Sequence, residues 1–333
     1  CTTNASGDCT LTITSATPGA STVNVSATVE VIPGHSVFRS TATTPGQGGS
    51  GPATKNWVDA YVQVTPDDVN EVNDPHTFTV EYGVLTGGAT GLTTDTPVIT
   101  PSVTPPGYTG YSDTCAAPTQ VSGQAVWRCT VTINSTGATV YTAGATASTT
   151  VRMTGGTPSE VTLTRSTGGT AGPGGNAGAT KTYVDARISI TPDGLNQVDD
   201  PTTPAIDDPH TITATVETKD GNGAWSKAPA GTPVSFALSG VGSFVGGANT
   251  CTTAGTTGQC SVQVNSTVYG TTTVGASTAV TVHGVPITRA TGTAVNTAAG
   301  GSGDVTKKWV DASITVVETA VNEVGDEHTF TIT

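Results

Sequence analysis

The sequence has few positive charges, a single methionine and few aromatic residues. Twelve basic side chains stand against 25 acidic ones, which leaves a formal net charge of -13. This balance excludes the basic surface by which most proteins hold nucleic acid. The sequence also contains no apolar run near the roughly eighteen residues of a membrane-spanning helix, so no membrane span is expected in this segment. The chain begins at Cys1 without a charged, apolar leader and ends inside an apparent strand, "HTFTIT", which favours a window of a longer polypeptide.

Signatures of catalysis are missing as well. The sequence has no Gly-x-Ser-x-Gly elbow, no His-Glu-x-x-His and no phosphate-binding loop. Its six cysteines are grouped in pairs, so no isolated cysteine suggests a nucleophile. We therefore expect a protein that is not an enzyme and that requires no organic cofactor.

Strand-forming and turn-forming residues dominate what is present. Threonine makes up about a fifth of the chain, with 42 glycines and 20 prolines. Branched side chains favour strands, and glycine and proline favour the turns between them. Apolar residues make up 35% and alternate with polar ones, so the chain can build a core and does not have a disordered composition.

A domain-sized repeat organises the sequence. The phrases "KNWVDAYVQVTP", "KTYVDARISITP" and "KKWVDASITVVE" place an aromatic residue at Trp57, Tyr183 and Trp309, and both intervals are 126 residues (183-57=126, 309-183=126). A second phrase, "NEVNDPHTFTV", also recurs. Gly-rich stretches such as "TPGQGGSGPAT" are predicted connectors. The predicted division is the end of one repeat (1-54), two complete repeats (55-180 and 181-306) and the start of another (307-333).

Within each repeat the apolar residues alternate with a period of two. In "VDAYVQV", Val58, Ala60, Val62 and Val64 share one face, which is typical of a half-buried strand. About seven such strands in roughly 120 residues predict an immunoglobulin-like sandwich. The order "GTPVSF", "GVGSF", "TTAGTTGQCSVQVNST" and "GTTTVGAS" resembles the bacterial Ig-like repeats of invasin/intimin-type surface proteins. The resemblance covers 181-306 best, and a Pro/Thr-rich insertion, "TDTPVITPSVTPPGYTG", weakens it in 55-180.

This resemblance implies an all-β fold of tandem immunoglobulin-like β-sandwich domains arranged as an elongated string. It also implies a role as an extracellular stalk, adhesin or fibre. Similarity of fold does not indicate the function more closely than this general role.

The cysteines form one local pair per repeat, and the second member always opens an alternating strand. Two ligands per repeat, with no histidine at ligand spacing, do not complete a four-ligand zinc site, which favours disulfides. Disulfides persist in oxidising surroundings, so the chain is expected outside the cytosol or at the cell surface. The predicted pairs are Cys1 with Cys9, Cys115 with Cys129, and Cys251 with Cys260.

Four Asn-x-Ser/Thr sequons are candidate glycosylation sites: Asn4, Asn24, Asn134 and Asn265. Such sequons also arise by chance in a Thr-rich chain, and an asparagine that closes a strand in a turn is the alternative interpretation. Acidic residues cluster in the turns after the first strand of each repeat, where gathered oxygen ligands suit calcium. The alternative is that these side chains cap turns. The candidate calcium ligands are Asp67, Asp68, Asp74, Asp193, Asp199, Asp200, Asp207 and Asp208.

Other recurring residues have structural interpretations. His76, His210 and His328 have no recurring partner nearby in the sequence and are expected to pack at a core edge. Trp57, Tyr183 and Trp309 are expected to fill the junction after a connector, with sugar stacking as the alternative. Arg39, Arg165 and Arg289 are expected to pair with an unidentified carboxylate. A Lys-Asn isopeptide at Lys55, Lys181 or Lys307 would need a buried lysine, which is rare, so none is expected.

Two functions follow from these patterns. The first is a structural segment of a prokaryotic surface fibre or stalk, in which further copies or the same continuing chain extend the repeats head to tail into a filament. The alternative is a ligand- or glycan-binding adhesin region. Its recognition loop would be the insertion around Thr94 to Gly110, which carries Tyr108 and Tyr111 nearby.

Overall fold

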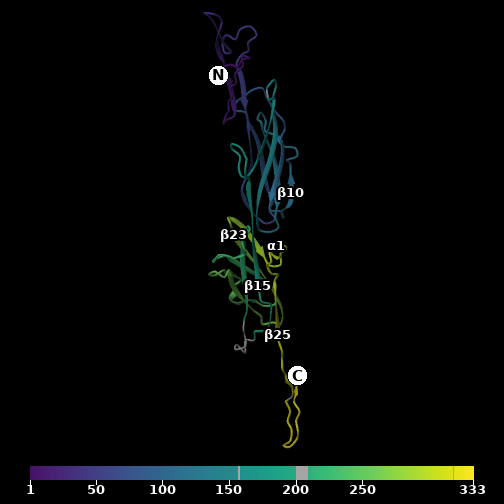
Figure 1. The fold of residues 1–333 in the computed structure, drawn as a ribbon. Coiled ribbons are helices and arrows are strands. Elements are labelled where there is room, and N and C mark those ends of the chain that lie inside the picture. The colour runs from purple at the N-terminus through teal and green to yellow at the C-terminus, as the bar shows by residue number, and fades with distance from the viewer. Residues whose placement is uncertain (157, 200–208, 318) are drawn as a thin grey trace. The chain divides into compact units, whose positions relative to one another are not determined.

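The computed structural model describes residues 1–156, 158–199, 209–317 and 319–333. The chain divides into two compact units. Unit 1 comprises Cys1–Asp68, Asn73–Thr136 and Val140–Lys181, and unit 2 comprises Val69–Val72, Gly137–Thr139 and Thr182–Thr333. Strands make up nearly all of the regular structure in both units (Figure 1).

The first fourteen strands of the chain lie in unit 1, apart from three residues of β6 and the first residue of β13, which belong to unit 2. They are β1 (Gly19–Val23), β2 (Ser26–Ile32), β3 (His35–Ser40), β4 (Ala53–Trp57), β5 (Asp59–Thr65), β6 (Asp68–Glu71), β7 (His76–Leu85), β8 (Leu92–Thr94), β9 (Val98–Thr104), β10 (Thr109–Asp113), β11 (Thr119–Gln120), β12 (Val126–Asn134), β13 (Thr139–Met153) and β14 (Glu160–Ser166). One sheet has the order β10-β12-β7-β5, with β11 beside β12. In the other, β13 pairs with β14, β8 and β9, and also with β15 (Ala179–Thr191).

The inner faces of these two sheets form the core of unit 1. Val62 of β5 lies opposite Tyr82 of β7, and Tyr82 lies opposite Trp127 of β12. All three side chains are buried. Large aromatic and branched side chains that meet across strands stabilise a sheet pair by about 0.2–1 kcal/mol per pair beyond Ala–Ala.

Unit 2 repeats this plan. Its elements after β15 are β16 (Gly194–Gln197), β17 (His210–Asp220), β18 (Ser226–Lys227), β19 (Pro233–Gly240), β20 (Ser243–Phe244), the 3-10 helix η1 (Val245–Gly247), β21 (Thr250–Thr252), β22 (Gln259–Asn265), β23 (Gly270–Val282), β24 (Val285–Ala290), α1 (Ala294–Ala298), β25 (Val305–Val310), β26 (Val316–Val317) and β27 (Thr331–Ile332). One sheet contains β15-β17-β22-β20 and the other β16-β25-β23-β19-β21, with β24 beside β23.

The core of unit 2 lies between these sheets. Ile188 and Ile212 from one sheet and Phe236 and Val274 from the other belong to one cluster of buried apolar side chains. Fully burying a side chain of this size contributes about 1.5–3 kcal/mol. Two mainly antiparallel sheets packed on a shared apolar core confirm the predicted all-β, immunoglobulin-like sandwich.

The segment interpreted from sequence as an insertion in the first complete repeat is instead a core strand. β9 pairs with β13 from Thr104↔Thr142 to Val98↔Ser148, as β19 pairs with β23 in unit 2. Ile99 and Val103 of β9 are buried. β9 therefore occupies the position of a strand in the sandwich. The predicted recognition loop around Thr94 to Gly110 is largely built into the sheets of unit 1.

Two of the Gly-rich stretches, those around residues 171–176 and around Asn296, pack against the first strand of their own repeat. In unit 1, Val62 N–H donates to Ala171 O (2.9 Å), and the amide of Asn176 bonds both Val64 N–H (3.0 Å) and Val64 O (2.7 Å). In unit 2, Asn296 of α1 bonds Ile188 N–H (2.9 Å) and Ile188 O (3.0 Å). These bonds satisfy backbone groups that an edge strand would otherwise expose.

Glycine is required in one of these stretches by close approach rather than by flexibility. Gly172 has φ +81°, and a Cβ there would lie 1.9 Å from Ala60 O. Both the left-handed backbone and the contact exclude a side chain.

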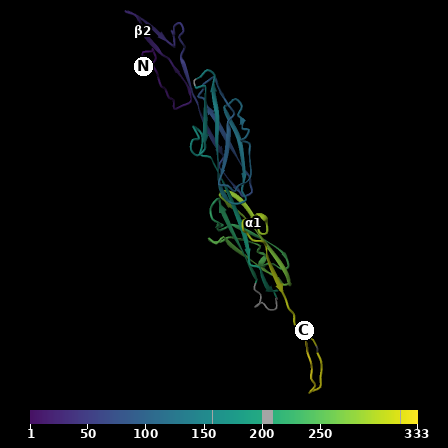
Figure 2. The same ribbon diagram turned by 45° about the vertical axis from the view of Figure 1, so that its right-hand side comes forward.

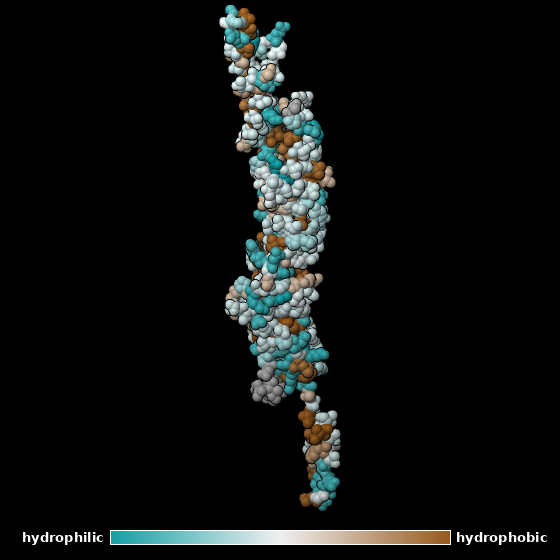
Figure 3. Space-filling view, viewed as in Figure 1, coloured by the Kyte–Doolittle hydropathy of each residue, from teal (hydrophilic) through white to brown (hydrophobic). Residues whose placement is uncertain are grey.

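Apolar strand residues are exposed in the last segment of the chain. Ile314 and Val316 are 78% and 61% exposed, whereas Ile188 and Ile190, which occupy the same positions one repeat earlier, are 0% and 4% exposed. The described residues of this segment form the short hairpin of β26 and β27, the yellow hairpin at the C-terminal end in Figures 1 and 2. Figure 3 shows apolar residues on its surface.

Candidate functional site

The repeated arginines hold the first strand of each sandwich. In unit 2, Arg289 of β24 is 1% exposed, donates to Ala186 O (3.0 Å) and forms an ion pair with Asp185 of β15. In unit 1, Arg165 donates to Ala60 O (2.8 Å) and pairs with Asp59. For Arg165 and Arg289 the unidentified carboxylate partner is therefore the aspartate of the recurring Val-Asp-Ala phrase, and Arg289 also pairs with Glu71.

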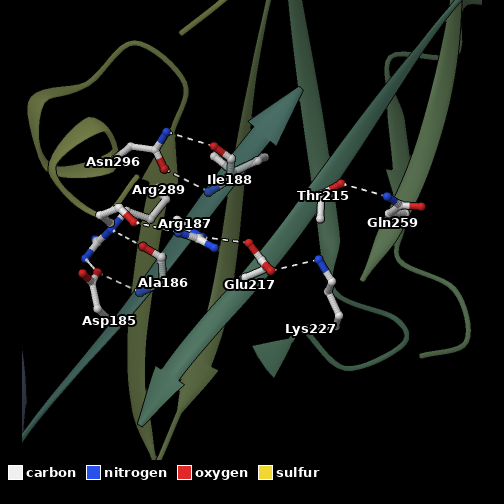
Figure 4. A network of polar contacts seen from close by, with 11 residues as sticks. Asp185, Ala186, Arg187, Ile188, Thr215, Glu217, Lys227, Gln259, Arg289 and Asn296 are labelled. Carbon is white, nitrogen blue, oxygen red and sulfur yellow. Dashed lines mark hydrogen bonds and ion pairs between the residues drawn. The ribbon is translucent and has the colours of Figure 1, made fainter. Parts of the chain in front are cut away.

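Burial dominates the electrostatics of the Arg289 pair. It raises the pKa of Asp185, and the hydrogen bond and charge of Arg289 oppose that rise. Figure 4 shows the arginine between the Asp185 carboxylate and the Ala186 carbonyl.

A second polar cluster in unit 2 centres on Glu217 of β17. It accepts hydrogen bonds from Arg187 (2.7 Å) and Lys227 (2.8 Å), as Figure 4 shows. Burial alone would raise the pKa of Glu217, but the hydrogen bonds and charges of the two cations lower it below its ordinary value. In unit 1, Glu81 accepts bonds from Tyr61 (2.7 Å) and Arg128 (2.6 Å), and burial with this carboxylate raises the pKa of Tyr61 to about 12.

A buried lysine lies at one end of each sandwich, which the sequence did not lead us to expect. In unit 1, the side chain of Lys181 is 0% exposed, and its Nζ is 2.9 Å from Asp68 Oδ2. The same oxygen lies 3.2 Å from Nδ1 of His76, whose ring packs edge-on against Phe78 at 4.5 Å. Burial and the Lys181 charge lower the pKa of His76. The predicted packing of His76 is thus observed, together with partners from distant sequence.

The corresponding lysine of unit 2 has different neighbours. Lys307 of β25 contacts Asn196 Oδ1 of β16, and its Nζ is 3.3 Å from Nδ1 of His210. Gly194 stands directly across the parallel β16–β25 pair, and a Cβ there would lie 2.7 Å from both Lys307 Nζ and His210 Cε1. Burial lowers the pKa of Lys307.

The six cysteines form three disulfides, each within one local pair: Cys1–Cys9, Cys115–Cys129 and Cys251–Cys260. In unit 2, Cys260 lies in β22 and Cys251 in β21, whose strand partner is β19 of the other sheet. This bridge therefore links the two sheets of one sandwich.

Most of the predicted calcium ligands that the structure describes bond protein groups. Asp67 accepts from Thr180 N–H (2.6 Å), Asp193 from Thr306 N–H (2.6 Å), and Asp199 from the Asn265 amide (2.8 Å). In the described ranges no group of three or more His, Cys, Asp or Glu side chains is arranged to hold a metal ion. Asp200, Asp207 and Asp208 lie outside the described residues, so calcium binding stays a prediction.

The four sequons differ in access. Asn4 and Asn24 are exposed, whereas Asn134 and Asn265 are half-buried. The Asn265 Nδ2 atom, which a glycan would occupy, donates to Asp199. Glycosylation at Asn4 or Asn24 would need less rearrangement than at Asn265.

A hollow of about 410 Å³ lies in unit 1 beside Trp57, with Lys55, Leu92, Arg152 and Glu160 among its lining residues. The indole N–H of Trp57 donates to Ser21 Oγ (2.9 Å), which fixes the ring at the rim. The two tyrosines of the expected recognition loop contact each other elsewhere, with ring centroids 5.7 Å apart.

Comparison with known proteins gives structural likeness alone. No protein-family model and no curated protein matches the sequence. Solved structures similar to the chain include the Escherichia coli adhesin FdeC (16% identity, TM-score 0.30, covering 78% of this chain and 67% of that one) and the D00-D0 domain of Intimin (18%, 0.28, 69% and 97%). Yersinia pseudotuberculosis InvD is also similar (14%, 0.24, 81% and 66%). These are bacterial proteins of the type that the sequence pattern resembles, at values too low to transfer a function.

Among the described helices, none has the length and apolarity needed to cross a membrane.

Proposed function

We propose that this chain is a segment of an extracellular stalk or fibre at a prokaryotic cell surface, extended head to tail by further repeats of the same kind. Each sandwich has its own core, its own Arg-Asp pair and its own disulfide. Independent units of one design, joined in series, suit a spacer. The disulfides support an oxidising, extracellular location.

The observation that carries the proposal is the exposed segment of residues 312–316. Ile314 and Val316 are exposed here, whereas the residues at the equivalent positions in unit 2 are buried in the core. An apolar face that is buried at the equivalent place in unit 2 is suited to packing against further strands, and exposed strand edges readily add them. The strands that complete it would come from the same polypeptide or from a neighbouring copy.

The experiment compares two variants of the chain in solution. Ile314→Asp places a charge on the apolar face, and Thr315→Asp places the same charge on the opposite face as the matched control. We expect concentration-dependent, elongated assemblies by small-angle scattering and electron microscopy, lost in the first variant and kept in the second. A monodisperse monomer whose last 27 residues resist protease would refute head-to-tail extension.

The second candidate function is an adhesin region that binds a glycan, which the hollow beside Trp57 favours. The indole of Trp57, which is one of the residues that line this hollow, offers the stacking surface that sugars use. Binding on a glycan array that is lost in Trp57→Ala and kept in Trp127→Phe, a change in the core, would support this function. Absence of any glycan binding would leave the structural role alone.

A further inference from the structure

The burial of Lys307 needs a chemical explanation. The side chain is 1% exposed and lies on the same face of β25 as Trp309, with Nζ 5.3 Å from the indole ring. Lysine is almost never fully buried unless a carboxylate pairs with it. Within the part of the chain that the structure describes, no ion pair includes Lys307. Burial lowers the pKa of the amine and so favours its neutral form, which is nucleophilic.

Among the described residues, two polar groups contact this amine. One is the carboxamide oxygen of Asn196, whose carbon lies one carbonyl bond, about 1.23 Å, further on. The other is Nδ1 of His210 at 3.3 Å. Gly194 leaves room for all three, since a Cβ at this position would lie 2.7 Å from the amine and from the imidazole.

The tautomer of His210 follows from its second contact. Its Nε2 lies 3.1 Å from Pro192 O, and a carbonyl oxygen only accepts hydrogen bonds. Nε2 therefore carries a hydrogen, and in the neutral form of the ring Nδ1 presents its lone pair to Lys307. A lone pair at hydrogen-bond distance from an attacking amine is the arrangement that general-base catalysis requires.

We propose that Lys307 and Asn196 condense into an intramolecular isopeptide bond. The Nζ–Cγ bond forms and the Cγ–Nδ2 bond breaks. Nδ1 of His210 takes the proton that the amine gives up and returns it to Nδ2, which leaves as ammonia. The step needs no oxidant, reductant or cofactor. This modification goes beyond the proposed structural role and does not depend on filament formation.

Two physical effects favour the reaction. Reactive groups held in contact by a folded scaffold gain effective molarities of about 10⁵–10⁸ M over free reactants. The product is also a neutral amide. Unit 2 then no longer bears the free-energy cost of burying an amine that becomes charged when it is protonated.

The bond would change how unit 2 carries tension. Asn196 and Lys307 lie on adjacent, parallel strands, β16 and β25, and are 111 residues apart in the chain. A covalent link between them bypasses most of the sandwich. A pull applied across these two residues would then reach the amide without unfolding the core between them.

The test is the mass of the full chain, purified with its disulfides intact. We expect a mass that is lower by one ammonia than the mass of the sequence with its three disulfides, and a joined pair of proteolytic peptides, one with Asn196 and one with Lys307, lighter than their sum by one ammonia. Lys307→Arg and Asn196→Ala should abolish the joined pair. Lys308→Arg, which changes the exposed neighbour, should keep it.

A separate variant tests the base. His210→Gln should lower the fraction of joined peptides at a given time after purification by at least tenfold, and an unchanged fraction would overturn the role of His210. If the chain without substitutions gives separate peptides at the masses that their sequences require, the proposed bond does not exist. The isopeptide bond is tested by mass and filament formation is tested by scattering. A negative result for one therefore does not affect the other.

Discussion

Replacing Arg289 by leucine should be among the most damaging single changes in unit 2. The guanidinium is 1% exposed, and its partner Asp185 is 6% exposed. Removing one member of a buried pair leaves the other charge uncompensated, at a cost of about 3–5 kcal/mol. A domain of this size has a total stability of about 5–15 kcal/mol, so Arg289→Leu would bring unit 2 close to its unfolding threshold.

The pH dependence of this variant has a defined sign. Burial already raises the pKa of Asp185, and Arg289 is the group that opposes the rise. Without the arginine the folded-state pKa rises further, and a raised carboxyl pKa favours folding below the unfolded pKa and disfavours it as pH increases. The deficit of Arg289→Leu should therefore be largest at neutral pH and shrink as pH falls toward the ordinary range of aspartate.

The assay is denaturant unfolding followed by tryptophan fluorescence at several pH values, with Trp309 reporting on unit 2. Arg152→Leu serves as the control, because Arg152 is 45% exposed and its partners Asp95 and Glu160 are exposed too. It should leave the midpoint unchanged within error. If both variants lose stability equally, or if the Arg289 deficit grows in acid, the reasoning from burial is wrong.

Three further predictions follow from the same structure. Glu217→Gln should lower the stability of unit 2 by at most about 1 kcal/mol at neutral pH. Because Arg187 and Lys227 lower the pKa of Glu217, the loss should vanish as pH falls through that pKa, and a loss that persists in acid would contradict it. Gly172→Ala should destabilise unit 1 more than Gly88→Ala. Both glycines have φ +81°, but only at Gly172 would a Cβ lie against backbone atoms. Equal unfolding midpoints for the two variants would contradict the docked position of the Gly-rich stretch. Reducing Cys251–Cys260 should cost about 2–3 kcal/mol, and non-reduced peptide mapping should show only local links; a link between repeats would refute the pairing.

The alternation of apolar residues was sufficient to predict the strands and the class of fold. It failed at β9, where Pro101 interrupts the pattern and the fixed interval of 126 residues no longer aligns the repeats. The phrase "TPV" at Thr96 aligns with "TPV" at Thr232, an interval of 136 (232-96=136), because loops between strands differ in length. Loop insertions have a small energetic cost, so the register of pairing survives where the sequence interval does not.

Glycine content was misleading for a related reason. A run such as "AGPGGNAGAT" is typical of a flexible linker by composition. Here the absence of side chains lets the backbone approach β5 closely enough to bond its edge, and Gly172 is the point of closest approach. The composition of a Gly-rich segment permits both a flexible linker and a docked segment. The strand that the segment packs against determines which of the two it forms.

The buried lysine was the largest gap in the sequence-based prediction. One local signal was available: Lys307 lies two residues before Trp309, and in a strand this places both on one face. The contacts that define the site come from Asn196 and His210, 111 and 97 residues away. No local pattern relates residues at such distances.

The buried polar contacts of unit 2 share a pattern that apolar burial alone does not explain. Arg289 bonds Asp185 over 104 residues, Asn296 bonds Ile188 over 108, and Lys307 contacts Asn196 over 111. Each joins the first strands of the repeat to its last segment. Apolar contacts are non-directional and tolerate alternative pairings, whereas a buried polar group is costly unless its one partner is in place. We therefore expect apolar burial to form the sandwich and these three contacts to select the closed arrangement, in which the two ends of the repeat cannot separate without exposing all three.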